Sequence, residues 1–286
     1  MKKCLYLLAV LMLLIPWNCS AENSCEDLYA LPLDFSFPNY SPDPAGFRDM
    51  TYHDETLDIS IEPVTWKGLT FHVAHVKVAS PTQLRTAIAG KPNATVTELP
   101  SVMGEKLNAV LVVNGEYYTH RTRDIFVYRQ GFMLRNAPDP VKDVLIIDDR
   151  GDFHVFTSAD KAQEIQSFLD AGNTVCQAFS FGPALIADGE QVKFRKDYYF
   201  NPDERTWRTF IAQDGPLSYV FVISEGSTQR EIYDFAAALD LQAAYNLDGG
   251  QSSVMLFNGQ YVGDRKKSSE RPQSDIIYIV TAVPDR

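Results

Sequence analysis

The residues best suited to chemistry lie near the C-terminus, in the sequence NLDGGQSS at positions 246–253. Apolar residues on both sides predict two short β-strands, with the paired glycines as the turn between them. Asp248 would then stand at a strand end, where a backbone without Cβ atoms lets a ligand approach closely. Turn N–H groups and the hydroxyls of Ser252 and Ser253 can bind an anion by donating hydrogen bonds to it. The alternative is a tight hairpin turn that binds nothing.

Three other stretches place polar side chains beside an expected strand end. They are NGEYY at 114–118, RTWRT at 205–209 and ERPQSD at 270–275. Glu116 is the second candidate carboxylate, while Arg208 and Arg271 carry guanidinium groups that can bind a phosphate through two parallel hydrogen bonds. Each stretch alone is more simply a turn or a surface ion pair. Their meeting at one place would form a site on rigid supports.

The histidines do not have the spacing of a metal site. The chain has five histidines. His72 and His75 fall on opposite faces of an expected strand, and the other three are scattered along the sequence. We therefore expect that no cofactor is required. Binding of Ca²⁺ or Mg²⁺ through Asp248 and other oxygen ligands is the alternative that the residues leave open.

The elements that must position these residues are mostly strands. Ser80 with Gln83, and Thr228 with Glu231, have the capping-box spacing that begins a helix. We expect an α+β fold with mixed, largely antiparallel sheets and about three to four helices. The expected strands are 57–61, 69–78, 109–113, 144–147, 153–156, 179–186, 210–212, 219–223 and 276–280, and the expected helices are about 80–90, 159–169 and 228–239.

The 286 residues suit a single domain with two N-terminal additions. Residues 1–21 have the charged start, short apolar stretch and small-residue end of a signal peptide, and that stretch is too short to span a membrane. Residues 22–55 are rich in proline and aromatic residues, which predicts an extended arm without regular structure. Residues 56–286 form the domain itself.

The leader and the charge together indicate an exported protein, periplasmic or secreted. The formal charge is −11, and loss of the two leader lysines brings it to −13. Such an acidic chain is unsuited to nucleic acid or an anionic membrane, so neither is expected as a partner. Lipid attachment at Cys19 is disfavoured because the preceding residues 16–18 are bulky. Cys25 and Cys176 would remain as one disulfide or two thiols.

Taken together, the stretches resemble the motifs of the phosphodiester glycosidase family. Members in animals remove an N-acetylglucosamine cap from mannose phosphate, and bacterial members are often linked to exopolysaccharide. The stretch at 246–253 is similar to the family's NLDGGGS, 114–118 to NG(D/E)YY, 207–212 to PRTAIG and 270–275 to ER-x-x-SD. The order matches from about residue 56 to 280. Gln251 replaces the third glycine, and Trp207 and Ala212 replace a proline and a glycine.

The resemblance implies cleavage of a sugar–O–phosphate linkage at the anomeric carbon, which releases a free sugar and a phosphomonoester. The partner would be a carbohydrate phosphodiester or a cell-surface polysaccharide. An oxocarbenium-like transition state needs a nearby carboxylate, assigned to Asp248, with Glu116 as acid/base or hydroxyl-positioning group and Arg208 neutralising phosphate charge. The expected substrate-binding residues are Asn114, Gly115, Tyr117, Gly182, Asn246, Gly249, Gly250, Ser252, Ser253 and Arg271.

Two alternative functions stay open at this point. The chain could bind carbohydrate on the same fold without turning it over, with Gln251 as the suspect change. It could also hydrolyse ordinary O-glycosides, in which case loss of the Arg208 guanidinium would leave activity on uncharged aryl glycosides largely intact.

Overall fold

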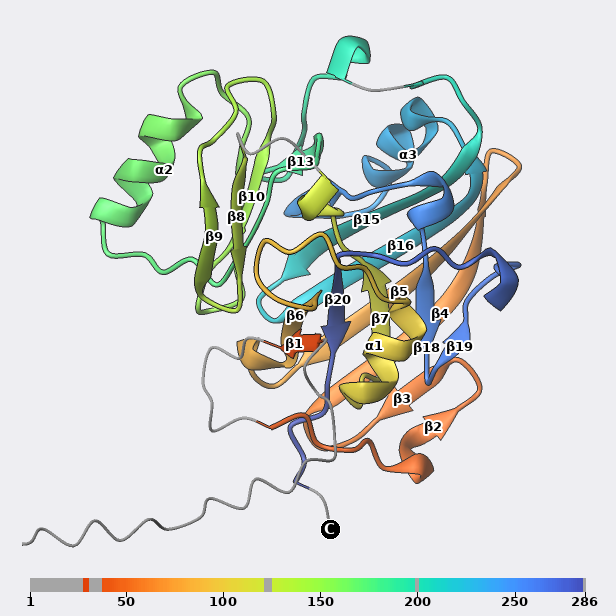
Figure 1. Ribbon diagram of the computed structural model, residues 1–286. Helices are drawn as coiled ribbons and strands as arrows, with labels where there is room; N and C mark the ends of the chain where they lie inside the picture. The colour runs from red at the N-terminus through yellow and green to blue at the C-terminus, as the bar shows by residue number, and fades with distance from the viewer. Residues whose placement is uncertain (1–27, 31–37, 121–124, 199–200, 285–286) are drawn as a thin grey trace, which may run out of the picture.

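The computed structural model describes residues 28–30, 38–120, 125–198 and 201–284. In these ranges, three sheets and three α-helices form the α+β fold that the sequence predicts (Figure 1). The leader, Cys19 and Cys25 lie outside the described residues, so the export signal and the pairing of Cys176 are untested. Cys176 itself is buried.

The largest sheet has nine strands, and every strand in it pairs antiparallel with its neighbours. Buried and exposed residues alternate along the first half of β4, as expected for a strand with one face on the core. Lys67 and Gly68, both with positive φ, turn β4 into β5. In sheet order the strands are β14 (Glu190–Gln191), β13 (Ala184–Ala187), β17 (Ala243–Asn246), β15 (Thr206–Gly215), β16 (Ser218–Ser227), β5 (Leu69–Val78), β4 (Leu57–Trp66), β3 (Thr51–His53) and β2 (Phe47–Arg48).

The two smaller sheets are also antiparallel. The six-stranded sheet contains β1 (Leu28–Ala30), β6 (Leu84–Ala89), β20 (Asp275–Ile279), β7 (Leu111–Asn114), β18 (Met255–Phe257) and β19 (Gln260–Tyr261). The five-stranded sheet contains β11 (Phe153–Phe156), β10 (Val144–Ile147), β12 (Gln177–Phe179), β8 (Phe126–Arg129) and β9 (Phe132–Asn136).

The main core lies between the nine-stranded and six-stranded sheets, where inward residues of β4, β16 and β17 meet those of β7, β18 and β20. Each helix covers the outside of one sheet (Figure 1). The helix α1 (Pro100–Lys106) packs on the six-stranded sheet, α2 (Lys161–Asp170) on the five-stranded sheet and α3 (Gln229–Ala236) on the nine-stranded sheet. Short 3₁₀ helices span Pro44–Gly46, Pro81–Gln83, Tyr118–His120, Lys196–Tyr198, Gly250–Ser252 and Lys267–Ser269.

Three sequence predictions of local structure are wrong. The expected strand at 179–186 is two strands in different sheets, since β12 ends at Phe179 and β13 begins at Ala184. The expected helix at 80–90 is a single 3₁₀ turn followed by β6, although the capping box between Ser80 and Gln83 is present. A capping box fixes only the first turn, and the next six residues are all buried between β1 and β20, where pairing favours a strand. The arm also has regular structure, since β3 extends the sheet beside β4. The helix α1 was not predicted.

Candidate active site

The NLDGGQSS stretch connects two different sheets. The strand β17 ends at Asn246 in the nine-stranded sheet, and β18 begins at Met255 in the six-stranded sheet. The hairpin alternative is therefore wrong. Gly250 turns the chain with φ of +65°, a conformation that favours glycine, and opens the short 3₁₀ helix Gly250–Ser252. We call residues 247–254 the inter-sheet loop.

Asn114, at the end of β7, holds the inter-sheet loop in place. Its Nδ2 donates to the main-chain oxygen of Asp248 (2.9 Å), and its Oδ1 accepts from the Val254 N–H (3.1 Å) and the Thr209 hydroxyl (2.9 Å). The side chain is fully buried, so both its donor and its acceptor are used inside the protein. This arrangement assigns Asn114 a positioning role in place of the predicted contact with substrate.

Asp248 and Arg208 line one cavity of about 440 Å³. The volume lies in the range of small-molecule sites. Leu247, beside Asp248, is fixed to β15 by its N–H, which donates to the Thr209 oxygen (2.9 Å). Four more predicted residues line the same cavity, namely Gly182, Asn246, Gly249 and Gly250. The structure therefore brings together six of the predicted site residues, from three separate segments of the chain.

Main-chain oxygens orient the Arg208 guanidinium at the cavity wall. Its Nη2 donates to the Glu204 oxygen (3.0 Å), and its Nε donates to the Ser227 oxygen (3.4 Å). Gly249 lies against this side chain, since a Cβ there would stand 3.8 Å from Nη1. These bonds to carbonyl groups hold the guanidinium at the cavity wall, where its positive charge can attract an anion.

Five polar lining residues were not predicted from the sequence or were left without a role there. Glu204 is the second acidic side chain of the cavity wall in the described chain. Lys142 places its Nζ 4.2 Å from the centre of the Tyr198 ring. No local pattern marks such isolated residues, and only the fold brings them to the loop. The others are Thr206, Gln229 and Gln251, of which Gln251 was noted only as a departure from the family motif.

Glu116 does not line the cavity. It is fully buried, and its Oε1 accepts from Arg129 Nη2 (2.7 Å) while its Oε2 accepts from the Ser180 N–H (2.7 Å). Asp275 binds the same Arg129 nitrogen at 2.7 Å. We call Glu116, Arg129 and Asp275 the buried triad. The structure corrects the predicted acid–base role, because a carboxylate closed off from the cavity cannot exchange a proton with substrate there.

Burial and charge set the proton affinities inside the buried triad. Burial raises the pKa of Glu116 above its usual range, and the neighbouring Arg129 offsets only part of this effect. Burial disfavours the charged form of Arg129, yet the two carboxylates outweigh it and raise the pKa of that guanidinium. Gly115 serves this cluster too, because a Cβ there would lie 2.1 Å from Asp275 Oδ2. Its predicted contact with substrate is therefore replaced by a packing role.

Arg271 and Tyr117 lie beside the inter-sheet loop but outside the cavity. The Arg271 guanidinium is 4.7 Å from the Tyr117 ring centre, and His120 stacks on Tyr117 at 4.1 Å. Gln273 connects them to the loop, because its Nε2 donates to the main-chain oxygens of Arg271 (3.2 Å) and Ser252 (3.4 Å). Both arginines were expected to bind one phosphate, but only Arg208 lines the cavity.

The two serines of the loop are buried and also do not line the cavity. Neither hydroxyl has a hydrogen-bond partner among the described residues, so their predicted contact with substrate stays a prediction. Tyr118 is a buried core residue. Tyr198 is largely buried at the edge of the cavity.

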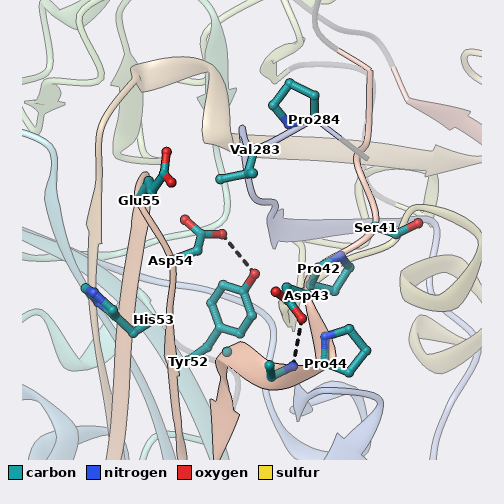
Figure 2. Close-up of a pocket in the computed structure, with 12 residues that line it drawn as sticks. Ser41, Pro42, Asp43, Pro44, Tyr52, His53, Asp54, Glu55, Val283 and Pro284 are labelled. Atoms are coloured by element: carbon teal, nitrogen blue, oxygen red, sulfur yellow. Dashed lines mark hydrogen bonds between the residues drawn. The ribbon is translucent and has the colours of Figure 1, made fainter. Parts of the chain in front are cut away.

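A second cavity, of about 620 Å³, lies beside β3 and the end of the described chain (Figure 2). Figure 2 shows the Tyr52 hydroxyl bonded to Asp54, and Asp43 accepting from the Ala45 N–H. The wall includes Asp43, Asp54 and Glu55 and no arginine or lysine. Three carboxylates repel a phosphodiester, so the smaller cavity at Asp248 is the better candidate despite its size.

The comparison with protein families agrees with this location. The family model for phosphodiester glycosidases matches residues 107–280, which is more than half of the chain and includes every lining residue of the Asp248 cavity. The chain belongs to the phosphodiester glycosidase family. Among curated proteins, none matches it.

Solved structures support the same fold. The catalytic domain of zebrafish N-acetylglucosamine-1-phosphodiester alpha-N-acetylglucosaminidase, auto-inhibited by its pro-peptide, is similar with a TM-score of 0.61 and 17% identity over 89% of this chain and 88% of that one. A hypothetical protein from Synechocystis is similar with a TM-score of 0.57 and 17% identity over 79% of this chain and 62% of that one. At these identities the likeness establishes the fold alone.

In the described part of the chain, none of the helices has the length and apolar character of a membrane-spanning segment. No group of three or more His, Cys, Asp or Glu side chains in those ranges is arranged to hold a metal ion. The open alternative of an oxygen-bound Ca²⁺ or Mg²⁺ at Asp248 stays a prediction.

Proposed function

We propose that the protein is an exported glycosidase that hydrolyses a sugar-1-phosphodiester at the anomeric carbon. The products would be a free sugar and a phosphomonoester. The observation that carries the proposal is the shared cavity of Asp248 and Arg208, which sets a carboxylate and an oriented guanidinium around a space of about 440 Å³. Membership of the phosphodiester glycosidase family supports the reaction class.

The cavity residues divide the chemical tasks between them. Asp248 stands nearest the anomeric carbon, where its negative charge stabilises the oxocarbenium-like transition state. The Gly249 N–H donates to its Oδ1 (2.9 Å), and Asn114 holds the main chain at the same residue. Arg208 receives the departing phosphate, which is already anionic and so needs charge neutralisation more than protonation. Glu204 takes the place of Glu116 as the second carboxylate, and Lys142 adds a second cation.

The carbohydrate is an N-acetylglucosamine-like sugar joined through phosphate to a second group, as in a cell-surface polymer. We infer its location outside the cytoplasm from residues 1–21, whose charge and apolar pattern suit export. The chemistry at Asp248 and Arg208 would be the same whether the second group is a small alcohol or a polysaccharide.

Turnover of a model substrate tests the proposal. The purified protein is incubated with methyl N-acetyl-α-glucosaminyl phosphate, and free N-acetylglucosamine and methyl phosphate are followed by mass spectrometry. The proposal requires turnover by the wild type that is lost in Asp248→Asn. Binding without turnover, across a broad panel of sugar phosphodiesters, would instead establish a carbohydrate-binding protein on this fold.

A further inference from the structure

Gln229 is a buried residue of the cavity wall whose acceptor oxygen has no partner. It is the first residue of α3, has no exposed surface and lines the Asp248 cavity. Among the described residues, its Oε1 makes no hydrogen bond. Buried polar atoms in native proteins nearly always have a partner, so an orphan at a cavity calls for a ligand or a bound water.

The orientation of the Gln229 amide follows from its neighbours. Asn246 Nδ2 donates to the main-chain oxygen of Gly182 (2.8 Å), and a carbonyl can only accept. Asn246 must therefore turn its Oδ1 towards Gln229, whose Nε2 donates to it (3.3 Å). The reverse orientation of both amides would set Asn246 Oδ1 against the Gly182 oxygen. The Gly182 carbonyl thus fixes Gln229 Oε1 as the atom left for a ligand.

The orphan oxygen selects the chemistry of its partner. An ionised phosphodiester has only acceptor oxygens at its phosphate, so it has no hydrogen to give to Gln229. Arg208 and Lys142 supply the cations for that group on the same cavity wall. A ligand that pairs with Gln229 must therefore bring a hydrogen-bond donor, and hydroxyls and an acetamido N–H are the donors that a sugar carries.

We propose that Gln229 Oε1 accepts a hydrogen bond from one donor group of the sugar and thereby sets the sugar preference of the site. This inference rests on the proposed function, because it requires a glycosyl phosphate in the Asp248 cavity. Asn246 acts as the positioning residue that holds the Gln229 amide. An analogue that lacks the one donor would leave the acceptor unpaired and bind more weakly.

Calorimetric binding of glycosyl phosphates tests the assignment on the full chain. The probes are N-acetylglucosamine 1-phosphate, glucose 1-phosphate, its 2-, 3-, 4- and 6-deoxy analogues, and inorganic phosphate. The wild type should bind one analogue, the one without the paired donor, roughly tenfold more weakly than its parent. In Gln229→Met this difference should disappear, while the affinity for inorganic phosphate changes less than about twofold. Gln229→Leu provides a second variant of different shape, and thermal unfolding checks that both fold.

Gln213→Met is the matched control. Gln213 is another buried glutamine, but its Oε1 accepts from the Phe153 N–H (2.8 Å) and its Nε2 donates to Asp152 (3.2 Å). This variant should lose stability and keep the discrimination between analogues. Unchanged discrimination in Gln229→Met would overturn the inference alone. Failure of the wild type to bind any sugar phosphate more tightly than inorganic phosphate would overturn both this inference and the proposed function.

Discussion

Two acidic regions lie at the same end of the six-stranded sheet, and they differ in what surrounds their charge. At the cavity, Asp248 is partly exposed and faces a space that it shares with Arg208. In the buried triad, Glu116 is closed off and bonded to Arg129 and the Ser180 N–H. Asn114 joins the two regions, since it is two residues before Glu116 and bonds to the Asp248 oxygen.

The different surroundings distinguish a carboxylate that faces a cavity from one that stabilises the fold. Both follow or precede a glycine at a strand end, so their local sequences are alike. What distinguishes them is Arg129, which reaches Glu116 from β8 and Asp275 on β20 at the same time. The buried triad ties β7, β8 and β20 beneath the site, and through Ser180 it anchors the segment that reaches the cavity at Phe181 and Gly182.

The largest expected effect is on catalysis at Asp248. Asp248→Asn removes the negative charge beside the anomeric carbon and keeps the size of the side chain. The rate constant kcat on a sugar phosphodiester should fall at least about 10³-fold, and the free energy of unfolding should change by less than about 1 kcal/mol. A variant that keeps a tenth or more of the activity would place the reacting carboxylate elsewhere.

Arg208 should contribute mainly through the phosphate. Arg208→Gln should lower kcat/KM for a sugar phosphodiester roughly 10²-fold, because the developing charge on the leaving group loses its guanidinium. Activity on an uncharged aryl glycoside, if the wild type has any, should change much less. Arg205→Gln is the control. Arg205 directly precedes β15, but it pairs with Glu231 and does not line the cavity. Equal losses in the two variants would contradict the assignment.

Glu116 should instead determine stability. Both of its carboxyl oxygens accept hydrogen bonds, and an amide offers only one acceptor, so Glu116→Gln should lower the free energy of unfolding by roughly 3 kcal/mol. Urea unfolding of the two proteins measures the difference. The folded variant should keep kcat within about tenfold of the wild type. A variant of unchanged stability and abolished turnover would return Glu116 to the chemistry.

The smallest expected effect is a pH dependence of stability. Because burial raises the pKa of Glu116 above its ordinary 4.5, the folded protein holds that proton more tightly than the unfolded chain. The resulting stabilisation is complete below pH 4.5 and is lost as the pH rises through the folded-state pKa. Unfolding curves from pH 4 upward should therefore decline more for the wild type than for Glu116→Gln. Parallel curves would show that the pKa is not raised.

The sequence predicted the elements whose signals are local. The expected strands 57–61 and 69–78 correspond to β4 and β5, and the Thr228–Glu231 capping box predicted α3, which the structure confirms. The same kind of box at Ser80 predicted a helix wrongly, because pairing with β1 and β20 decides the conformation beyond the first turn.

The candidate site was predictable only in part. The motifs at 246–250 and 208 indicated the loop and the arginine that meet at the cavity. The sequence around Glu116 does not indicate that its carboxylate pairs with Arg129, since Arg129 lies on another strand, β8. Gln229, Glu204 and Lys142 stand alone in the sequence, and their place at the cavity depends on how α3 and two connecting segments pack.

Hydrolysis in ¹⁸O-labelled water tests the central claim most directly. Cleavage of the bond between the anomeric carbon and oxygen places the label in the sugar, whereas attack at phosphorus places it in the phosphomonoester. Mass spectrometry of rapidly quenched products distinguishes the two sites of cleavage. An unlabelled phosphomonoester is the result predicted for chemistry at Asp248, and a phosphomonoester that carries ¹⁸O would contradict it.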